Sequence, residues 1–241
     1  DKGFTQSFYQ GNGQWTAPKP CGAYKGRMTA IDRNGLNHEI IHKDNDIYYS
    51  RYDNKQWSPT VRIAQKAKPL FFYIDDREEK HLIYIKYRNG KPDLTYNFQK
   101  KGEAWKTHTI ARDIAYSWDW QEPGIAVSPA GTIYICCYND LFFKHNEQAD
   151  WKREKCKLDN VYMPVKLVCN ALGKVHFLYY SWEEKRKDAL NGFYYTVRDE
   201  SGKWNISERV GKDQPSERIP AFIISRYNEL IAAVFPDIEK K

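Results

Sequence analysis

Three tryptophans of this 241-residue chain stand apart from the five others. Trp118 and Trp120 lie in the segment "AYSWDWQEP", and Trp182 lies in "SWEEKRKDALNG". Indole rings exposed on loops provide flat apolar platforms on which sugars or bases can stack. Charged side chains that could orient a polar ligand lie in the same two segments: Asp119, Glu122 and Arg186. These six residues form the predicted ligand-binding site, whereas the simpler interpretation is that the indoles plug or cover the scaffold.

Carboxylates near these tryptophans are the candidates for catalysis. A glycosidase needs one carboxyl group as acid and one as base or nucleophile, about 5 to 9.5 Å apart. Glu122 and Glu217 precede predicted strands, and Asp119 and Asp213 lie further out on loops. Charged loops are often simply solvated. No catalytic residue is therefore predicted, enzymatic activity stays uncertain, and binding is favoured over chemistry.

Three histidines occupy equivalent positions in the pattern described below: His38, His81 and His176. A repeated residue indicates a repeated packing and hydrogen-bonding role. A metal site would need side chains that converge from different parts of the fold, which equivalent positions do not provide. No phosphate-binding loop or nucleophile elbow is present in the sequence. We expect no metal and no cofactor.

The other five tryptophans close five similar segments at intervals of 42, 48, 46 and 53 residues. Each segment joins an apolar run to a polar turn and a tryptophan: "FTQSFYQGNGQW", "DIYYSRYDNKQW", "DLTYNFQKKGEAW", "DLFFKHNEQADW" and "GFYYTVRDESGKW". Between these segments lie pairs of apolar runs joined by a turn, such as "IAVSPAGTIYICC". A period of this length with four short strands predicts the blade of a β-propeller. The repeated tryptophans are expected to pack the blades.

We predict an all-β fold, a single five-bladed β-propeller domain over residues 1–241 with four antiparallel strands in each blade. The N-terminal strands are expected to pair with the C-terminal strands, which closes the ring and removes exposed sheet edges. In such a ring the 4-1 and 2-3 loops share one face, which carries the predicted site. The predicted blades span residues 24–64, 67–111, 120–158, 161–210, and 215–236 combined with 4–21.

The repeated units resemble the degenerate blades of sialidase-like or Asp-box propellers and of five-bladed propeller lectins. Turns such as "RDESGKW" lie where an Asp box would sit, but no copy satisfies the pattern S/T-x-D-x-G-x-x-W. The resemblance covers nearly the whole chain at the level of architecture. It implies ligand binding, commonly of carbohydrate, and carries no set of catalytic residues.

Composition limits the partners and the compartment. The formal charge of +7 comes from basic residues spread along the chain and not from one basic stripe, so we do not expect nucleic acid as a partner. No apolar run is long enough to span a membrane, and we expect a soluble protein without a membrane partner. The five cysteines are odd in number and contain no CxxC pair, which favours a reducing, cytoplasmic compartment.

These observations leave three functional hypotheses. The first is a lectin-like module that binds a carbohydrate or other polar ligand at one asymmetric site, because the extra tryptophans occur in two blades only. The second is a protein-interaction scaffold that forms part of a larger protein, which the charged segment "EEKRKDALNG" would suit. The third is a glycoside hydrolase that acts on a polysaccharide. A glycan or polar small ligand and a protein are thus the expected partners.

Overall fold

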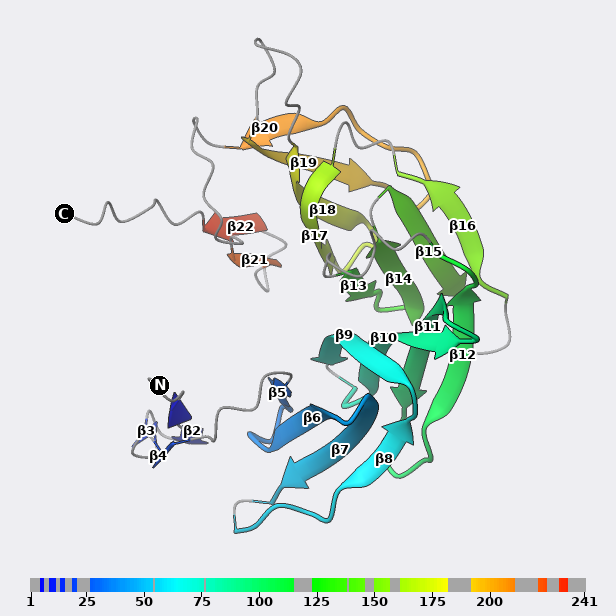
Figure 1. Ribbon diagram of the computed structural model, residues 1–241. Coiled ribbons are helices and arrows are strands. Elements are labelled where there is room, and N and C mark those ends of the chain that lie inside the picture. Colours follow the sequence, from blue (N-terminus) through cyan, green and yellow to red (C-terminus); the bar gives the residue numbers. More distant parts are fainter. Residues whose placement is uncertain are drawn as a thin grey trace, which may run out of the picture. The chain divides into compact units, whose positions relative to one another are not determined.

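The computed structural model is built from antiparallel β-strands in the part of the chain that it describes (Figure 1). That part comprises residues 27–53, 55–75, 77–114, 123–137, 139–145, 150–156, 161–181 and 192–210, with the backbone alone for 161–165 and for six short strands near the ends. None of these residues belongs to a helix that could cross a membrane. The chain divides into two compact units, Asp1–Tyr116 and Ser117–Lys241.

The first unit contains two four-stranded sheets, each a simple meander in which consecutive strands pair. One sheet has the strands β5 (Arg27–Ile31), β6 (Asn37–Lys43), β7 (Asp46–Tyr52) and β8 (Val61–Ala64). The other has β9 (Ala67–Ile74), β10 (Lys80–Arg88), β11 (Lys91–Gln99) and β12 (Lys106–Ala111).

The second unit repeats this plan. Its first sheet has the strands β13 (Gly124–Val127), β14 (Thr132–Cys137), β15 (Asp140–His145) and β16 (Lys152–Lys155). Its second sheet has β17 (Val161–Cys169), β18 (Val175–Ser181), β19 (Gly192–Arg198) and β20 (Glu208–Val210). The all-β class and the repeated four-stranded antiparallel sheet are therefore confirmed, and four such sheets are present among the described strands.

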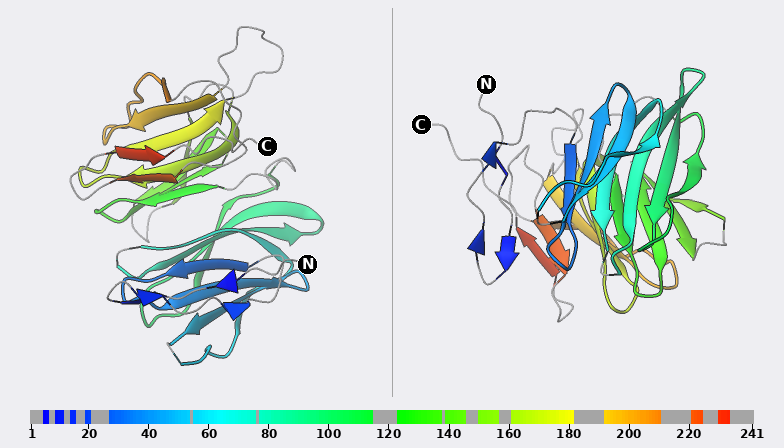
Figure 2. Two further views of the ribbon diagram at one scale, coloured as in Figure 1. Left: turned by 90° about the vertical axis from the view of Figure 1, so that its left-hand side faces the viewer. Right: turned by 90° about the horizontal axis from the view of Figure 1, so that it is seen from below.

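Short strands near the two ends form two-stranded pairs. At the N-terminal end, β1 (Thr5–Gln6) pairs with β4 (Lys19–Pro20), and β2 (Tyr9–Gly11) pairs with β3 (Gln14–Trp15). At the C-terminal end, β21 (Ala221–Ile224) pairs with β22 (Leu230–Ala233), and β21 lies against β17 (Figure 2). Among the described strands no N-terminal strand pairs with a C-terminal one. The fifth blade and the closed ring thus remain predictions, as do the single domain and its blade boundaries.

Alternation of apolar side chains explains how the sheets stack within each unit. In the first unit, Ile40 and Ile47 of one sheet and Phe72, Leu82 and Tyr84 of the other are buried in one core. In the second unit a corresponding core joins side chains from the two sheets: Tyr134, Cys136, Leu141, Phe143, Leu167, Phe177 and Tyr179. Each strand contributes alternate residues because successive side chains point to opposite faces of a sheet.

The repeated tryptophans behave as packing residues where they are described. Trp105 packs on the core of the first unit and meets Tyr49 edge-on at 5.6 Å between ring centroids. Trp204 packs on the core of the second unit, and its ring centroid lies 4.7 Å from that of Phe177. These two contacts confirm the predicted scaffold role for Trp105 and Trp204.

Candidate functional site

The connections between second and third strands and those that follow fourth strands meet at one end of each sheet, which we call the loop end. The N–H of Ala67, which opens β9, donates to the carbonyl of Asn45 in the β6–β7 turn at 2.7 Å. Ile114 and Pro92 form the same bond in the next sheet at 2.9 Å, and Cys156 and Asn139 form it in the third at 2.7 Å. The predicted sharing of one face by these two kinds of loop is confirmed for these three sheets.

In each of these three sheets an aspartate at or near the start of the third strand accepts hydrogen bonds from the connection that follows the fourth strand or from the fourth strand itself. Asp46 accepts from the N–H of Lys66 at 3.2 Å, and Asp93 accepts from the N–H of Asp113 at 3.1 Å. Asp140 accepts two bonds from Arg153, at 2.9 and 3.0 Å. These carboxylates are committed to the scaffold. The recurring acid that opens "DIYY", "DLTY" and "DLFF" is thus a structural residue.

Electrostatics at the loop end follow from these bonds. Burial alone would raise the pKa of Asp140, but the bonds from Arg153 and Lys155 outweigh it and hold the pKa below its ordinary value. Burial would also raise the pKa of Asp93. The hydrogen bonds from Arg88 and from the N–H of Asp113 outweigh it, and the pKa of Asp93 is lowered. Both groups are therefore anions near neutral pH and are poorly suited to donate a proton.

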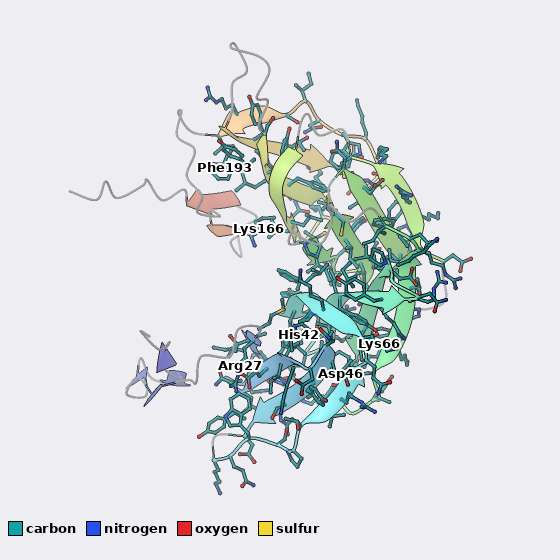
Figure 3. All side chains as sticks on the ribbon, viewed as in Figure 1. Arg27, His42, Asp46, Lys66, Lys166 and Phe193 are labelled. Atoms are coloured by element: carbon teal, nitrogen blue, oxygen red, sulfur yellow. The ribbon has the colours of Figure 1, made fainter. Side chains whose placement is uncertain are left out.

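Figure 3 shows where side chains near the ends of the strands lie in the two units. Arg27, His42, Asp46 and Lys66 belong to the first unit, at the ends of β5, β6 and β7 and in the turn before β9. His42 carries a buried Nε2 without a hydrogen-bond partner in the described structure. Lys166 of β17 and Phe193 of β19 belong to the second unit. Arg27 pairs with the buried Glu39 at 2.8 Å.

The six predicted site residues lie outside the described residues: Trp118, Asp119, Trp120, Glu122, Trp182 and Arg186. The connections that contain them start and end at described strands of known position in the topology. Residues 112–123 lead from β12 into β13, and residues 182–191 join β18 to β19. By contrast, two residues suffice to join β6 to β7, where Asp44 and Asn45 adopt positive φ values of 55° and 63°. Long connections at the loop end are where sequence can vary without disturbing the sheets.

The opposite end of the sheets, where first strands turn into second strands, carries a repeated polar cluster. His38 Nδ1 lies 2.6 Å from the hydroxyl of Tyr49, and His81 Nδ1 lies 2.7 Å from that of Tyr96. His176 repeats the contact with Tyr195 at 2.7 Å. The three equivalent histidines therefore share one hydrogen-bonding role, as predicted. Burial lowers the pKa of His38 and of His176 below 6.5.

The turn before each of these histidines is closed by an aspartate or asparagine. Asp32 accepts from the N–H groups of Asn34 and Leu36. Asp75 does the same for Arg77 and Glu79, and Asn170 does so for Leu172 and Lys174. Such side-chain to backbone bonds are a common way to fix a tight turn. Of the three turns, the one at Asp75 gathers a potential metal-binding group, Asp75, Glu79 and His81.

An ion pair between Arg198 and Glu154, which we call the strut, connects the two sheets of the second unit. Arg198 of β19 binds Glu154 of β16 with two bonds, at 2.7 and 3.1 Å, and the indole N–H of Trp204 donates to Glu154 at 3.1 Å. The guanidinium of Arg198 also lies over the rings of Phe143 and Tyr134, at 5.0 and 5.9 Å. Sequence reasoning missed this strut because its partners are 44 residues apart. The repeated tryptophan was the one available signal.

Comparison with known proteins identifies the fold. No protein-family model matches the chain, and no curated protein matches its sequence. Among solved structures, a protein assigned as a gluconolactonase has a TM-score of 0.52 and 12% identity, covering 92% of this chain and 75% of its own. A gluconolactonase from Xanthomonas campestris, described as important in glucose secondary metabolic pathways, has a TM-score of 0.50 and 12% identity, covering 85% of this chain and 67% of its own. These neighbours are β-propellers, so the propeller fold is supported.

The comparison corrects the functional prediction. The lectin-like module was expected from the loop tryptophans and the resemblance to binding propellers, and the interaction scaffold from the charged segment "EEKRKDALNG", whereas the similar structures carry the names of hydrolases. The physical reason for the error is that repeated residues specify the sheets, and one sheet scaffold supports many loop chemistries. The more specific resemblance to Asp-box propellers is not confirmed.

Proposed function

We propose that this protein is a propeller hydrolase that opens the cyclic ester of a sugar-derived lactone. The observation that carries the proposal is the likeness over 92% of the chain to a propeller assigned as a gluconolactonase. Because identity is 12%, residue roles must come from this chain itself. We therefore keep the six residues of the predicted ligand-binding site and propose that they bind the lactone substrate.

The reaction requires a base and a substrate platform. Water attacks the lactone carbonyl carbon while the base removes a proton from that water, and the base then returns the proton to the ring oxygen, which leaves as a hydroxyl group. We assign the base to Asp119 or Glu122, because the described aspartates of the loop end are occupied by scaffold bonds. Trp118, Trp120 and Trp182 would stack on the sugar ring, and Arg186 would bind the carboxylate of the product.

The proposal includes closure of the propeller. We infer that β21 and β22 combine with the N-terminal strands into a fifth blade. In support, the β17–β20 sheet is apolar on both faces: Leu178, Tyr180 and Phe193 form a second cluster on the face opposite Phe177 and Tyr179. On β5, Ile31 is 49% exposed. A blade inside a ring needs a neighbour on each face, which a fifth blade would supply.

The finer resemblance to Asp-box blades belongs to the same proposal. It is supported by the turn after β19, where Asp199 accepts from the N–H groups of Ser201 and Lys203, both at 2.9 Å.

The test is hydrolysis of aldonolactones by the full chain, followed by base titration at constant pH against the spontaneous rate. We expect saturable acceleration, a loss of kcat of about 100-fold or more in Glu122→Gln or Asp119→Asn, and a raised KM in Trp182→Ala. Glu200→Gln is the matched control, because Glu200 is exposed in the turn after β19. No acceleration with lactones of five-, six- and seven-carbon sugars would refute the proposed activity.

A further inference from the structure

A histidine at the start of β10, next to the turn between β9 and β10, has a buried side-chain nitrogen without a hydrogen-bond partner. His81 is fully buried, and its Nδ1 lies 2.7 Å from the hydroxyl of Tyr96. Its Nε2 has no hydrogen-bond partner and lies 3.6 Å from the nearest oxygen of Asp75. Buried polar atoms are nearly always paired, so an orphaned imidazole nitrogen needs an explanation.

Two carboxylates converge on the same place. Ligand atoms of Asp75, Glu79 and His81 all lie within 4.8 Å of one another. The guanidinium of Arg77 bridges the carboxylates, at 2.9 Å from Asp75 Oδ2 and 3.1 Å from Glu79 Oε2. The Arg77 side chain is 45% exposed, so it can swing away into solvent. The carboxylates are thus already arranged around one positive charge.

The equivalent turns show that this group exceeds what the scaffold needs. In the first sheet, His38 Nε2 reaches Asp32 at 3.1 Å, and the residue equivalent to Glu79 is Leu36. In the fourth sheet the turn is closed by Asn170, the equivalent residue is Lys174, and Nε2 of His176 is also buried without a hydrogen-bond partner. Those turns fold with one carboxylate or none. The second carboxylate and the open imidazole nitrogen therefore occur together at one of these three turns.

We propose that Asp75, Glu79 and His81 form a binding site for a divalent cation of the zinc class, with Arg77 as the displaceable cation of the empty site. One imidazole nitrogen and two carboxylate oxygens are a usual zinc donor set, which leaves a fourth position for water. When Nδ1–H donates to the Tyr96 hydroxyl, the lone pair of Nε2 is directed away from that bond and can bind a metal. The site lies at the end of the sheet opposite the loop end and does not depend on the proposed lactonase activity.

Bound metal would cross-link the β9–β10 turn to the start of β10 and stabilise the first unit. A ligand that binds the folded chain alone raises its melting temperature by mass action. We expect the metal-free full chain to bind about one equivalent of Zn²⁺ in competition with a chromophoric chelator, with a higher melting temperature as a result.

Two variants test the assignment, at Arg77, whose side chain is 45% exposed, and at Glu79, whose side chain is 17% exposed. Glu79→Leu installs the residue that the first sheet already uses and should weaken zinc binding by at least about tenfold. Arg77→Gln removes the competing charge and should tighten binding. Glu103→Leu is the matched control, because Glu103 is an exposed acid in another turn of the same sheet and should leave affinity unchanged.

X-ray absorption of the zinc-loaded chain should show nitrogen and oxygen ligands with an imidazole contribution. The proposal fails if the wild-type chain binds no zinc saturably, if Glu79→Leu retains wild-type affinity, or if sulfur ligands dominate the spectrum. Sulfur ligation would place the metal at cysteine side chains instead.

Discussion

At the scale of single residues, the repeated histidines show how a polar group is kept inside this fold. His176 is 9% exposed, stacks on Tyr195 at 6.0 Å between centroids, and bonds to the Tyr195 hydroxyl through Nδ1. Its Nε2 is buried without a hydrogen-bond partner in the described structure. Protonation would place a charge in this environment, which is why burial lowers the pKa.

This environment predicts a pH-dependent stability. With a folded-state pKa below 6.5, the unfolded chain takes up a proton first as the pH falls, so the stabilisation is complete above pH 6.5 and is lost as the pH falls towards the folded-state pKa. We expect the free energy of unfolding in urea to be lower at pH 5.5 than at pH 8. The phenylalanine variant His176→Phe should show a smaller difference, and an equal or larger one would contradict this account.

At the scale of strands and sheets, paired charges connect neighbouring sheets. Arg198 is 7% exposed and depends on Glu154 for its charge partner. In the first unit, Lys80 of β10 lies 5.9 Å from the ring of Tyr49 on β7. In both units a cation from the later sheet thus covers an aromatic ring of the earlier one. Within each unit, these contacts and the apolar core together hold the two sheets against each other.

Removing the Glu154 carboxylate should lower the free energy of unfolding. Glu154→Ala leaves the Arg198 charge buried and uncompensated, so we expect a loss of about 3 kcal/mol in the free energy of unfolding. Glu200→Ala, which removes an exposed acid, should change it by less than about 0.5 kcal/mol. A double-mutant cycle with Arg198→Met measures the coupling. A coupling energy near zero would show that the strut adds nothing to stability.

The sequence predicts the scaffold far better than the site. The opening aspartates and the equivalent histidines each recur in three of the four described sheets, and the closing tryptophans follow the third strand in all four, so their spacing predicts the sheets. Arg198 and Glu154 do not recur, and their pairing depends on how two sheets stack. The site segments at Trp118 and Trp182 also occur once each. A unique loop gives no second copy to compare, and this is why the functional class was misjudged.

At the scale of the whole molecule, the proposed closure makes the N-terminal strands part of the fold. Removing residues 1–23 would uncover one face of a neighbouring blade and one sheet edge. We expect the melting temperature to fall by at least about 5 °C, since each kcal/mol corresponds to roughly 2–4 °C for a chain of this size. An unchanged melting temperature would contradict closure and leave the four described sheets intact.

The most direct measurement of the central claim uses the eight tryptophan indoles as reporters, by nuclear magnetic resonance with a lactam analogue that resists hydrolysis. The claim is that substrate binds at the loop end of the second unit. We predict saturable shifts of the indole signals of Trp118, Trp120 and Trp182, assigned through single substitutions, and constant signals from Trp57, Trp105 and Trp204. Shifts confined to the latter three, or none at all at saturating analogue, would contradict the claim.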